Sequence, residues 1–331
     1  MIEYMNKIFL ILFFIIFLCM FSQNKINKEK FENYNNKPEF PIDVVYTWAG
    51  NKKSNDIRTS NNNELKYSIK SVLKYLPWVN HIYILMNPPK RKPSWIDESL
   101  DKYITVVDQT ETFPEGYDLP NKNSNAIETT LHNIKGLSEH FIYFNDDVFI
   151  GKPLDYTYFF TPEGKALISD LSIHGTKMLI KGKENKLKIK LPEMVNFFYN
   201  HVPISLLKSS IIDYQNEYPD YIKFIRNQTT RNDIGCDVCT DNNLKCPCQQ
   251  QHFIVARYMY KQNKAELKNY EITTRCSKDG YVNSYCLNYL DEILKNPPST
   301  FVIQDTENDK KKRPYFNYKI NEFFKKFFDE N

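Results

Sequence analysis

Short apolar runs alternate with segments of helical periodicity through the first half of the chain, and this alternation most restricts the fold. The runs are rich in β-branched and aromatic residues, which predicts buried strands. They comprise residues 41–50, 81–86, 103–108 and 141–150. Because strands that alternate with helices pair in parallel, we predict an α/β fold with a largely parallel sheet and helices on both faces.

Helices are predicted between these strands and again towards the C-terminus. In residues 61–77, apolar positions recur at helical spacing until Pro77 ends the pattern. In residues 124–137, Ser124 is the expected N-cap and Gly136 the expected end. Further helices are predicted in the second half of the chain, at 206–225, 249–262 and 318–331. The C-terminal part should therefore be mainly helical.

The sequence FIYFNDDVFI, residues 141–150, interrupts an apolar strand with two adjacent aspartates, Asp146 and Asp147. Ligands of open parallel sheets bind beyond the carboxyl ends of the strands, where this pair is expected. Two adjacent carboxylates repel, which raises the pKa of one of them unless a cation is bound. Oxygen ligands suit Mg²⁺ or Mn²⁺, with substrate phosphates completing the shell. The pair therefore indicates a metal site, and its structural alternative is one capping and one solvated aspartate.

The N-terminus differs from the rest of the chain. Residues 1–22 contain an unbroken apolar run, Ile8 to Phe21, which is shorter than the roughly 20 residues that span a typical bilayer. The run suits a membrane anchor or a signal segment, and we expect an uncleaved anchor because no good small-residue cleavage site follows. Residues 23–40 are polar and aperiodic, which is typical of a linker. One folded domain should then occupy residues 41–331.

Cysteine usage indicates an oxidising compartment. Six cysteines lie in the last third of the chain, and several of them form a Cys-rich insert at about 234–250. An even number of cysteines beyond a membrane segment suits disulfides. The C-x2-C-x6-C-x-C spacing also allows structural zinc, and free thiols are the third alternative. These features together predict a protein of the secretory pathway.

Several stretches resemble the Stealth family of sugar-phosphate transferases. The segments IDVVYTWAG (42–50), NNNELKYSIKSVLKYLPWVNHIYIL (61–85) and NSNAIETTLHNIKGLSEHFIYFNDDVFIG (123–151) are similar to its first two conserved regions. A third region is recognisable from His201 to Arg231. The family includes bacterial capsular polysaccharide phosphotransferases and the catalytic subunit of animal N-acetylglucosamine-1-phosphotransferase. The resemblance covers roughly residues 41 to 331.

The resemblance implies a Rossmann-like or GT-A-like nucleotide-sugar transferase core and a set of site residues. The implied catalytic residues are Glu128, Asp147, His201 and Arg231. The implied donor-binding residues are Asp43, Trp48 and Asn125, and the implied metal ligands are Asp146 and Asp147. The general base stays open among His201, Asp147 and Glu128.

The resemblance also implies a reaction and its partners. A sugar-1-phosphate, expected to be N-acetylhexosamine-1-phosphate, passes from a UDP-sugar to a hydroxyl of a glycan or glycoprotein acceptor, and UMP is released. We expect a single-pass Golgi membrane protein with a lumenal catalytic domain, and self-association into a homo-oligomer stays open. The alternatives are a metal-dependent glycosyltransferase and an inactive glycan- or nucleotide-sugar-binding relative, which the missing carboxylate at Asn61 motivates. The net charge of +4 is too mild to predict a nucleic-acid partner.

Overall fold

The computed structural model describes most of the chain after residue 36. The described residues are 37–50, 62–169, 176–177, 190, 192, 195–196, 202–230, 251–268, 281–282, 287–304, 309 and 311–328. The chain divides into two compact units, Met1–Lys37 and Pro38–Asn331. The predicted anchor (1–22), nearly all of the predicted linker and the Cys-rich insert lie outside the described residues. Among the helices that are described, none is long and apolar enough to cross a membrane.

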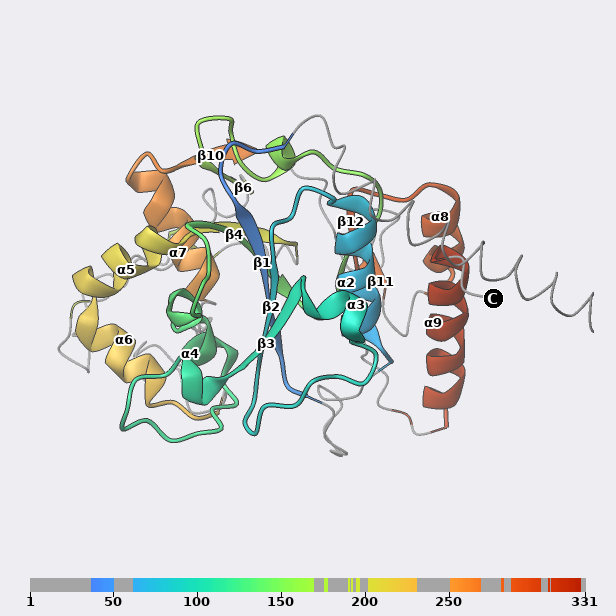
Figure 1. The fold of residues 1–331 in the computed structure, drawn as a ribbon, viewed down its shortest axis with the longest axis horizontal. Helices are drawn as coiled ribbons and strands as arrows, with labels where there is room; N and C mark the ends of the chain where they lie inside the picture. Colours follow the sequence, from blue (N-terminus) through green and yellow to red (C-terminus); the bar gives the residue numbers. More distant parts are fainter. Residues whose placement is uncertain are drawn as a thin grey trace, which may run out of the picture. The chain divides into compact units, whose positions relative to one another are not determined.

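A five-stranded sheet forms the centre of the Pro38–Asn331 unit (Figure 1). Its strands, in spatial order, are β3 (Ile104–Asp108), β2 (Ile82–Met86), β1 (Ile42–Trp48), β4 (His140–Asn145) and β9 (Ile204–Leu207). Neighbouring strands are parallel except β9, which pairs with β4 in the antiparallel sense. The prediction of an α/β fold with a largely parallel sheet is confirmed. The sheet's central strands are almost wholly buried because both of their faces are covered.

Helices cover both sides of the central strands. The described helices are α2 (Glu64–Tyr75), α3 (Glu98–Asp101), α4 (Ser124–Glu128), α5 (Lys208–Glu217), α6 (Pro219–Arg226), α7 (Gln251–Lys261), α8 (Tyr289–Lys295) and α9 (Arg313–Phe327). In Figure 1, α4, α5, α6 and α7 lie to one side of the strands, and α2, α8 and α9 lie to the other. The helix predicted at 206–225 is two helices, because Tyr218-Pro219 separates α5 from α6.

The stretch 141–150 is not one strand, contrary to the prediction. It divides into β4 and β5 (Val148–Ile150), with a turn at Asp146 and Asp147 between them. β5 leaves the central sheet and pairs with β12 (Thr300–Ile303), which also pairs with β11 (Tyr281–Val282). The remaining described strands form two small pairs, β6 (Ala166–Ser169) with β10 (Ala265–Lys268) and β7 (Thr176–Lys177) with β8 (Val195–Asn196).

Two serine side chains of α2 hold β5 in its position outside the central sheet. The hydroxyl of Ser68 donates to the carbonyl oxygen of Val148, and the N–H of Ile150 donates to the hydroxyl of Ser71 at 2.9 Å. Both serines are buried, so these bonds satisfy backbone groups that no sheet neighbour reaches. The aspartate pair is therefore a corner between two sheets, fixed on one side by β4 and on the other by α2.

The helix predicted at 124–137 is also shorter than expected. Its N-cap is Asn123, not Ser124, since the Asn123 side chain accepts the N–H of Asn125 at 3.1 Å. α4 stops at Glu128 because Thr129 and Thr130 turn their hydroxyls back onto carbonyl oxygens three residues earlier. A short 3-10 helix, Leu131–Asn133, follows.

An aromatic core packs β5 and β12 against α2, α8 and α9. The ring of Tyr67 stacks on Phe324 at 4.3 Å between centroids, and Phe149 stacks on Phe301 at 5.0 Å. The C-terminal helix contributes a continuous buried face, comprising Phe316, Ile320, Phe323, Phe324 and Phe327. This packing confirms the predicted amphipathic C-terminal helix and anchors the sheet into which the aspartate corner leads.

Candidate functional site

The carboxyl ends of the parallel strands meet at one edge of the central sheet. Thr47 is in register with Asn145, Trp48 with Met86, and Met86 with Asp108. Trp48 ends β1 and is partly buried, and the aspartate corner follows Asn145 directly. We call this the carboxyl edge, defined by Trp48, Met86, Asp108 and Asn145. It is the position at which ligands of open α/β sheets bind.

The aspartate corner carries concentrated negative charge. Burial and the neighbouring carboxylates of Asp147 and Glu64 raise the pKa of Asp146 well above its ordinary value. Glu64 starts α2 and accepts both the N–H and the side-chain N–H of Asn62, at 2.6 and 3.0 Å. The structure thus adds a third carboxylate to the predicted pair.

The side chains of the aspartate corner could supply only some of the ligands that a divalent cation needs. Within the described part of the chain, no group of three or more His, Cys, Asp or Glu side chains is arranged to hold a metal ion. Mg²⁺ commonly takes one or two carboxylates and completes its shell with water and substrate phosphates. The raised pKa of Asp146 shows a carboxylate whose charged form lacks compensation, which a cation would supply. Asp146 and Asp147 are therefore suitable ligands for a cation that arrives with a phosphate.

Glu128 lies at the end of α4 and is buried, at 4 % exposure. Its Oε2 accepts the backbone N–H of His252 at 3.2 Å and lies 2.9 Å from Nδ1 of the same residue. The hydroxyl of Tyr143 lies 3.4 Å from Oε1. The same hydroxyl lies 3.1 Å from Oδ1 of Asn145 and 2.8 Å from the hydroxyl of Thr47. A polar chain therefore joins Glu128 to the carboxyl edge.

Asn125 has unused hydrogen-bonding capacity. It precedes Glu128 by three residues and so lies on the same face of α4. Its side chain is buried, yet within the described residues neither its Oδ1 nor its Nδ2 has a hydrogen-bond partner. A buried amide without partners is costly, which suits a group that binds a ligand. This placement agrees with the predicted donor-binding role without testing it.

Asp43 does not join the other predicted residues. It lies near the start of β1, and Trp48 is five positions further along the strand, a distance of about 16 Å. It is fully buried, and its oxygens accept Nδ2 of Asn80 at 2.8 Å and the N–H of Ser138 at 2.7 Å. These bonds tie β1 to the loops at the amino end of the sheet, so its surroundings are those of a structural residue.

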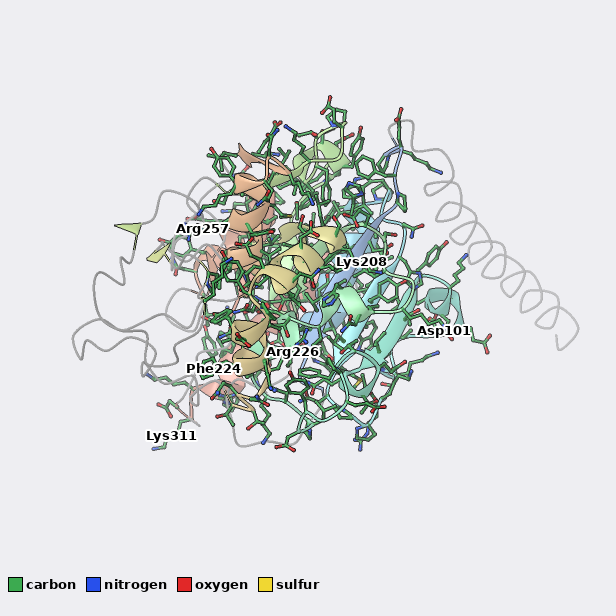
Figure 2. The ribbon with its side chains drawn as sticks, turned by 90° about the vertical axis from the view of Figure 1, so that its left-hand side faces the viewer. Asp101, Lys208, Phe224, Arg226, Arg257 and Lys311 are labelled. Carbon is green, nitrogen blue, oxygen red and sulfur yellow. The ribbon has the colours of Figure 1, made fainter. Side chains whose placement is uncertain are left out.

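Arg226 of α6 fixes the end of α4. Its guanidinium donates to the hydroxyl of Thr129 at 2.9 Å, to the carbonyl oxygen of Thr129 at 3.0 Å and to Gln215 at 2.8 Å. Figure 2 views the face formed by α5, α6 and α7 and labels Arg226 and Lys208 there. Burial, with Arg226 and Lys208 nearby, lowers the pKa of His132 to about 4. Arg226 therefore fixes the residue that directly follows Glu128 at the end of α4.

Two predicted catalytic residues, His201 and Arg231, lie outside the described residues. Their predicted roles stay predictions. The described strand that follows His201, β9, packs beside β4 and α7, and the described helix that precedes Arg231, α6, packs beside α4. The described chain between these two positions therefore contacts the elements that carry Glu128 and His252.

The sequence interpretation missed Glu64 and His252. Glu64 is within the segment that resembles the family, but as the first residue of a helix it was indistinguishable from an ordinary helix-start acid. His252 follows a Cys-rich stretch and lies at the start of a helix that was predicted at 249–262, so its sequence carries no local signal of a site. Only the packing of α7 against α4 brings it to Glu128.

Comparisons with known proteins identify the segment that bears Glu64, Glu128 and the aspartate corner. Residues 58–168 match the family model described as Stealth protein CR2, conserved region 2. We call residues 58–168 the Stealth region, because this third of the chain, roughly, is similar to that family model. This match confirms the predicted resemblance, and it includes α2, α4, the aspartate corner and the strands between them.

Relatives of the Stealth region are polysaccharide phosphotransferases by name. The chain is 42 % identical over 178 residues to the capsular polysaccharide phosphotransferase fcs1 of Haemophilus influenzae, covering 47 % of this chain and 48 % of that protein. It is 35 % identical over 233 residues to the capsular polysaccharide phosphotransferase LcbA of Aeromonas hydrophila, covering 60 % and 63 %. The matches therefore span less than two thirds of either relative.

Among solved structures, the chain is similar to the galactosyltransferase LgtC, crystallised in complex with donor and acceptor sugar analogs. The TM-score is 0.40 and the sequence identity 12 %, over 85 % of this chain and 95 % of that one.

Proposed function

We propose that this protein transfers a sugar-1-phosphate, specifically an N-acetylhexosamine-1-phosphate, from a UDP-sugar to a hydroxyl of a glycan acceptor. The observation that carries the proposal is the Stealth region itself. It contains Glu128, Asp146 and Asp147, and these carboxylates lie at or next to the carboxyl edge. The names of the relatives support phosphoryl transfer to a polysaccharide as the general class.

In the proposed reaction the acceptor oxygen attacks the phosphorus that carries the sugar. A new P–O bond forms to the acceptor, the P–O bond to UMP breaks, and UMP leaves with the electron pair. The hydroxyl proton passes to a carboxylate or imidazole, for which Glu128, Asp147 and His201 are the candidates. Of the two candidates that the structure describes, Glu128 is buried and Asp147 is partly exposed. Glu128 is connected to the carboxyl edge through Tyr143. Arg231 is proposed to hold the phosphate oxygens in a bidentate fork.

Charge neutralisation is the main requirement of phosphoryl transfer. A Mg²⁺ or Mn²⁺ ion held by Asp146 and Asp147 would neutralise the diphosphate of the donor. Asn125, with its unsatisfied amide, is proposed to bind the donor, and Trp48 is proposed to pack on its base or sugar.

A donor screen tests the proposal. The full-length chain is incubated with UDP-N-acetylglucosamine, UDP-N-acetylgalactosamine and UDP-glucose, with Mg²⁺ and glycan acceptors, and the nucleotide product is identified by mass spectrometry. The proposal expects UMP and an acceptor heavier by a sugar phosphate. Release of UDP would instead indicate a glycosyltransferase, and donor binding without nucleotide release would indicate an inactive relative.

We also propose that the catalytic domain lies in the lumen of the secretory pathway, anchored in the Golgi membrane by residues 1–22. The support is the apolar N-terminal run and the six cysteines beyond it. Intact-mass analysis of protein from a secretory host, with and without reduction, should show up to three disulfides. Six free thiols or one zinc per chain would contradict the disulfide assignment.

A further inference from the structure

Glu128 and His252 form a buried contact between helices that are far apart in the sequence. Nδ1 of His252 lies 2.9 Å from Oε2 of Glu128, and the two side chains are 3 % and 1 % exposed. The backbone N–H of His252, in the first turn of α7, donates to the same oxygen at 3.2 Å. Because Glu128 is the last residue of α4, this contact joins α4 to α7.

A carboxylate at this depth requires compensation. Burying an ionised group without partners costs several kcal/mol, and removing one partner of a buried charged pair leaves the other uncompensated. The backbone N–H of His252 donates a hydrogen bond to Oε2, and the ring nitrogen Nδ1 lies 2.9 Å from the same oxygen as a polar contact. The ring nitrogen is not aligned as a straight hydrogen bond. Such contacts in active sites often tighten only when substrate binds.

The other oxygen of Glu128 leads to the carboxyl edge. The hydroxyl of Tyr143 lies 3.4 Å from Oε1 and also contacts Asn145 and Thr47, at 3.1 and 2.8 Å. Asn145 is the residue immediately before the aspartate corner. A rotation of the Glu128 carboxylate would therefore change the contacts at the place where the diphosphate is proposed to bind.

We propose that His252 is a positioning residue for the transfer reaction, which holds the carboxylate of Glu128 in the orientation that the attacking hydroxyl requires. The proposal rests on the proposed function and adds to it a residue outside the matched Stealth region. His252 acts through Glu128 and not on the substrate. Its loss should therefore lower kcat more than it changes the KM for the donor.

Two substitutions of His252 separate the polar contact of its ring with Glu128 from the packing of its side chain. His252→Leu removes the ring donor and keeps an apolar side chain, and kcat for UMP release should fall about 10- to 100-fold with the donor KM within about threefold of wild type. His252→Asn places an amide N–H where Nδ1 stands, so it should recover most of the lost kcat. A role confined to packing would not favour Asn over Leu.

A double-mutant cycle with Glu128→Gln is the decisive measurement. If His252 acts through Glu128, His252→Leu should lower kcat by less than about threefold in the Glu128→Gln background. Thermal unfolding of each variant, followed by circular dichroism, shows how much of any loss comes from unfolded protein. His140→Asn is the matched control, because His140 is also a partly buried histidine, bonded to the carbonyl oxygen of Gly164 at 3.0 Å at the start of β4. It should lower stability and leave kcat unchanged.

The outcomes distinguish the two proposals. With an active wild type, a near-normal kcat in His252→Leu, or equal losses in both backgrounds, would overturn the role of His252 and leave the proposed function standing. A wild type that releases no UMP from any donor would overturn the proposed function and the role of His252 with it.

Discussion

Replacement of Asp43 by alanine tests whether this residue is structural, as its position indicates, or binds the donor, as the family resemblance implies. The carboxylate is fully buried and makes two hydrogen bonds, to Asn80 at 2.8 Å and to the N–H of Ser138 at 2.7 Å. A hydrogen bond to a charged group contributes about 1.5–3 kcal/mol. Asn80 is exposed and can bond water after the substitution, so we expect a total loss of about 3 kcal/mol of unfolding free energy.

This loss converts to a measurable change in melting temperature. The Pro38–Asn331 unit has roughly 290 residues, for which the unfolding entropy is about 0.6 kcal/mol per kelvin. Asp43→Ala should therefore melt about 5 °C below wild type by circular dichroism, and its kcat and donor KM at 25 °C should match wild type. Asp101→Ala is the control, because Asp101 is exposed and its carboxylate pairs with the exposed Lys92 at 2.5 Å. It should change stability by less than about 0.5 kcal/mol. A raised donor KM with an unchanged melting temperature would refute the structural assignment.

Further predictions concern the aspartate corner, acid stability and the packing of β5. Asp147→Asn removes one anion at constant volume and should lower kcat by at least about 100-fold, while the circular dichroism spectrum stays that of wild type. The pKa of His132 is lowered to about 4 in the folded state, so protonation favours unfolding: the stability that this group contributes is complete above about pH 6.5 and is lost as the pH falls towards 4. Urea unfolding should show about 2 kcal/mol less stability at pH 5 than at pH 7 from this residue, and His132→Asn should remove that difference. Gly151→Ala would place a methyl group 2.0 Å from the carbonyl oxygen of Pro298, so it should cost about 3 kcal/mol in the same assay, and a wild-type urea midpoint would contradict the close approach.

The strands of the core could be predicted because their pattern is local. The runs at β1, β2 and β3 are apolar, rich in β-branched residues and bounded by residues that end strands, so each could be recognised without its neighbours. That the sheet would be largely parallel followed from the alternation of strands and helices in this half of the chain. For the same reason the carboxyl edge could be predicted, and with it the position of Asp146.

The sequence also indicated which carboxylates are candidate site residues. The resemblance singled out Glu128 and the aspartate pair, and the structure places them at the end of α4 and next to the end of β4. It could not show what surrounds them, since the partners of Glu128 come from residues as distant in sequence as His252.

Tertiary contacts decided the remaining features. The break after β4 depends on β12 and on two serines of α2. These elements supply the hydrogen-bond partners of β5 outside the central sheet. The position of the end of α4 depends on Arg226 of α6, which donates to the hydroxyl and the carbonyl oxygen of Thr129. The partners of Asp43, Asn80 and Ser138, converge on it from distant parts of the chain, and the Glu128–His252 contact exists only because α7 packs on α4. Each of these outcomes depends on bonds between residues more than 30 positions apart, which local periodicity and propensity do not encode.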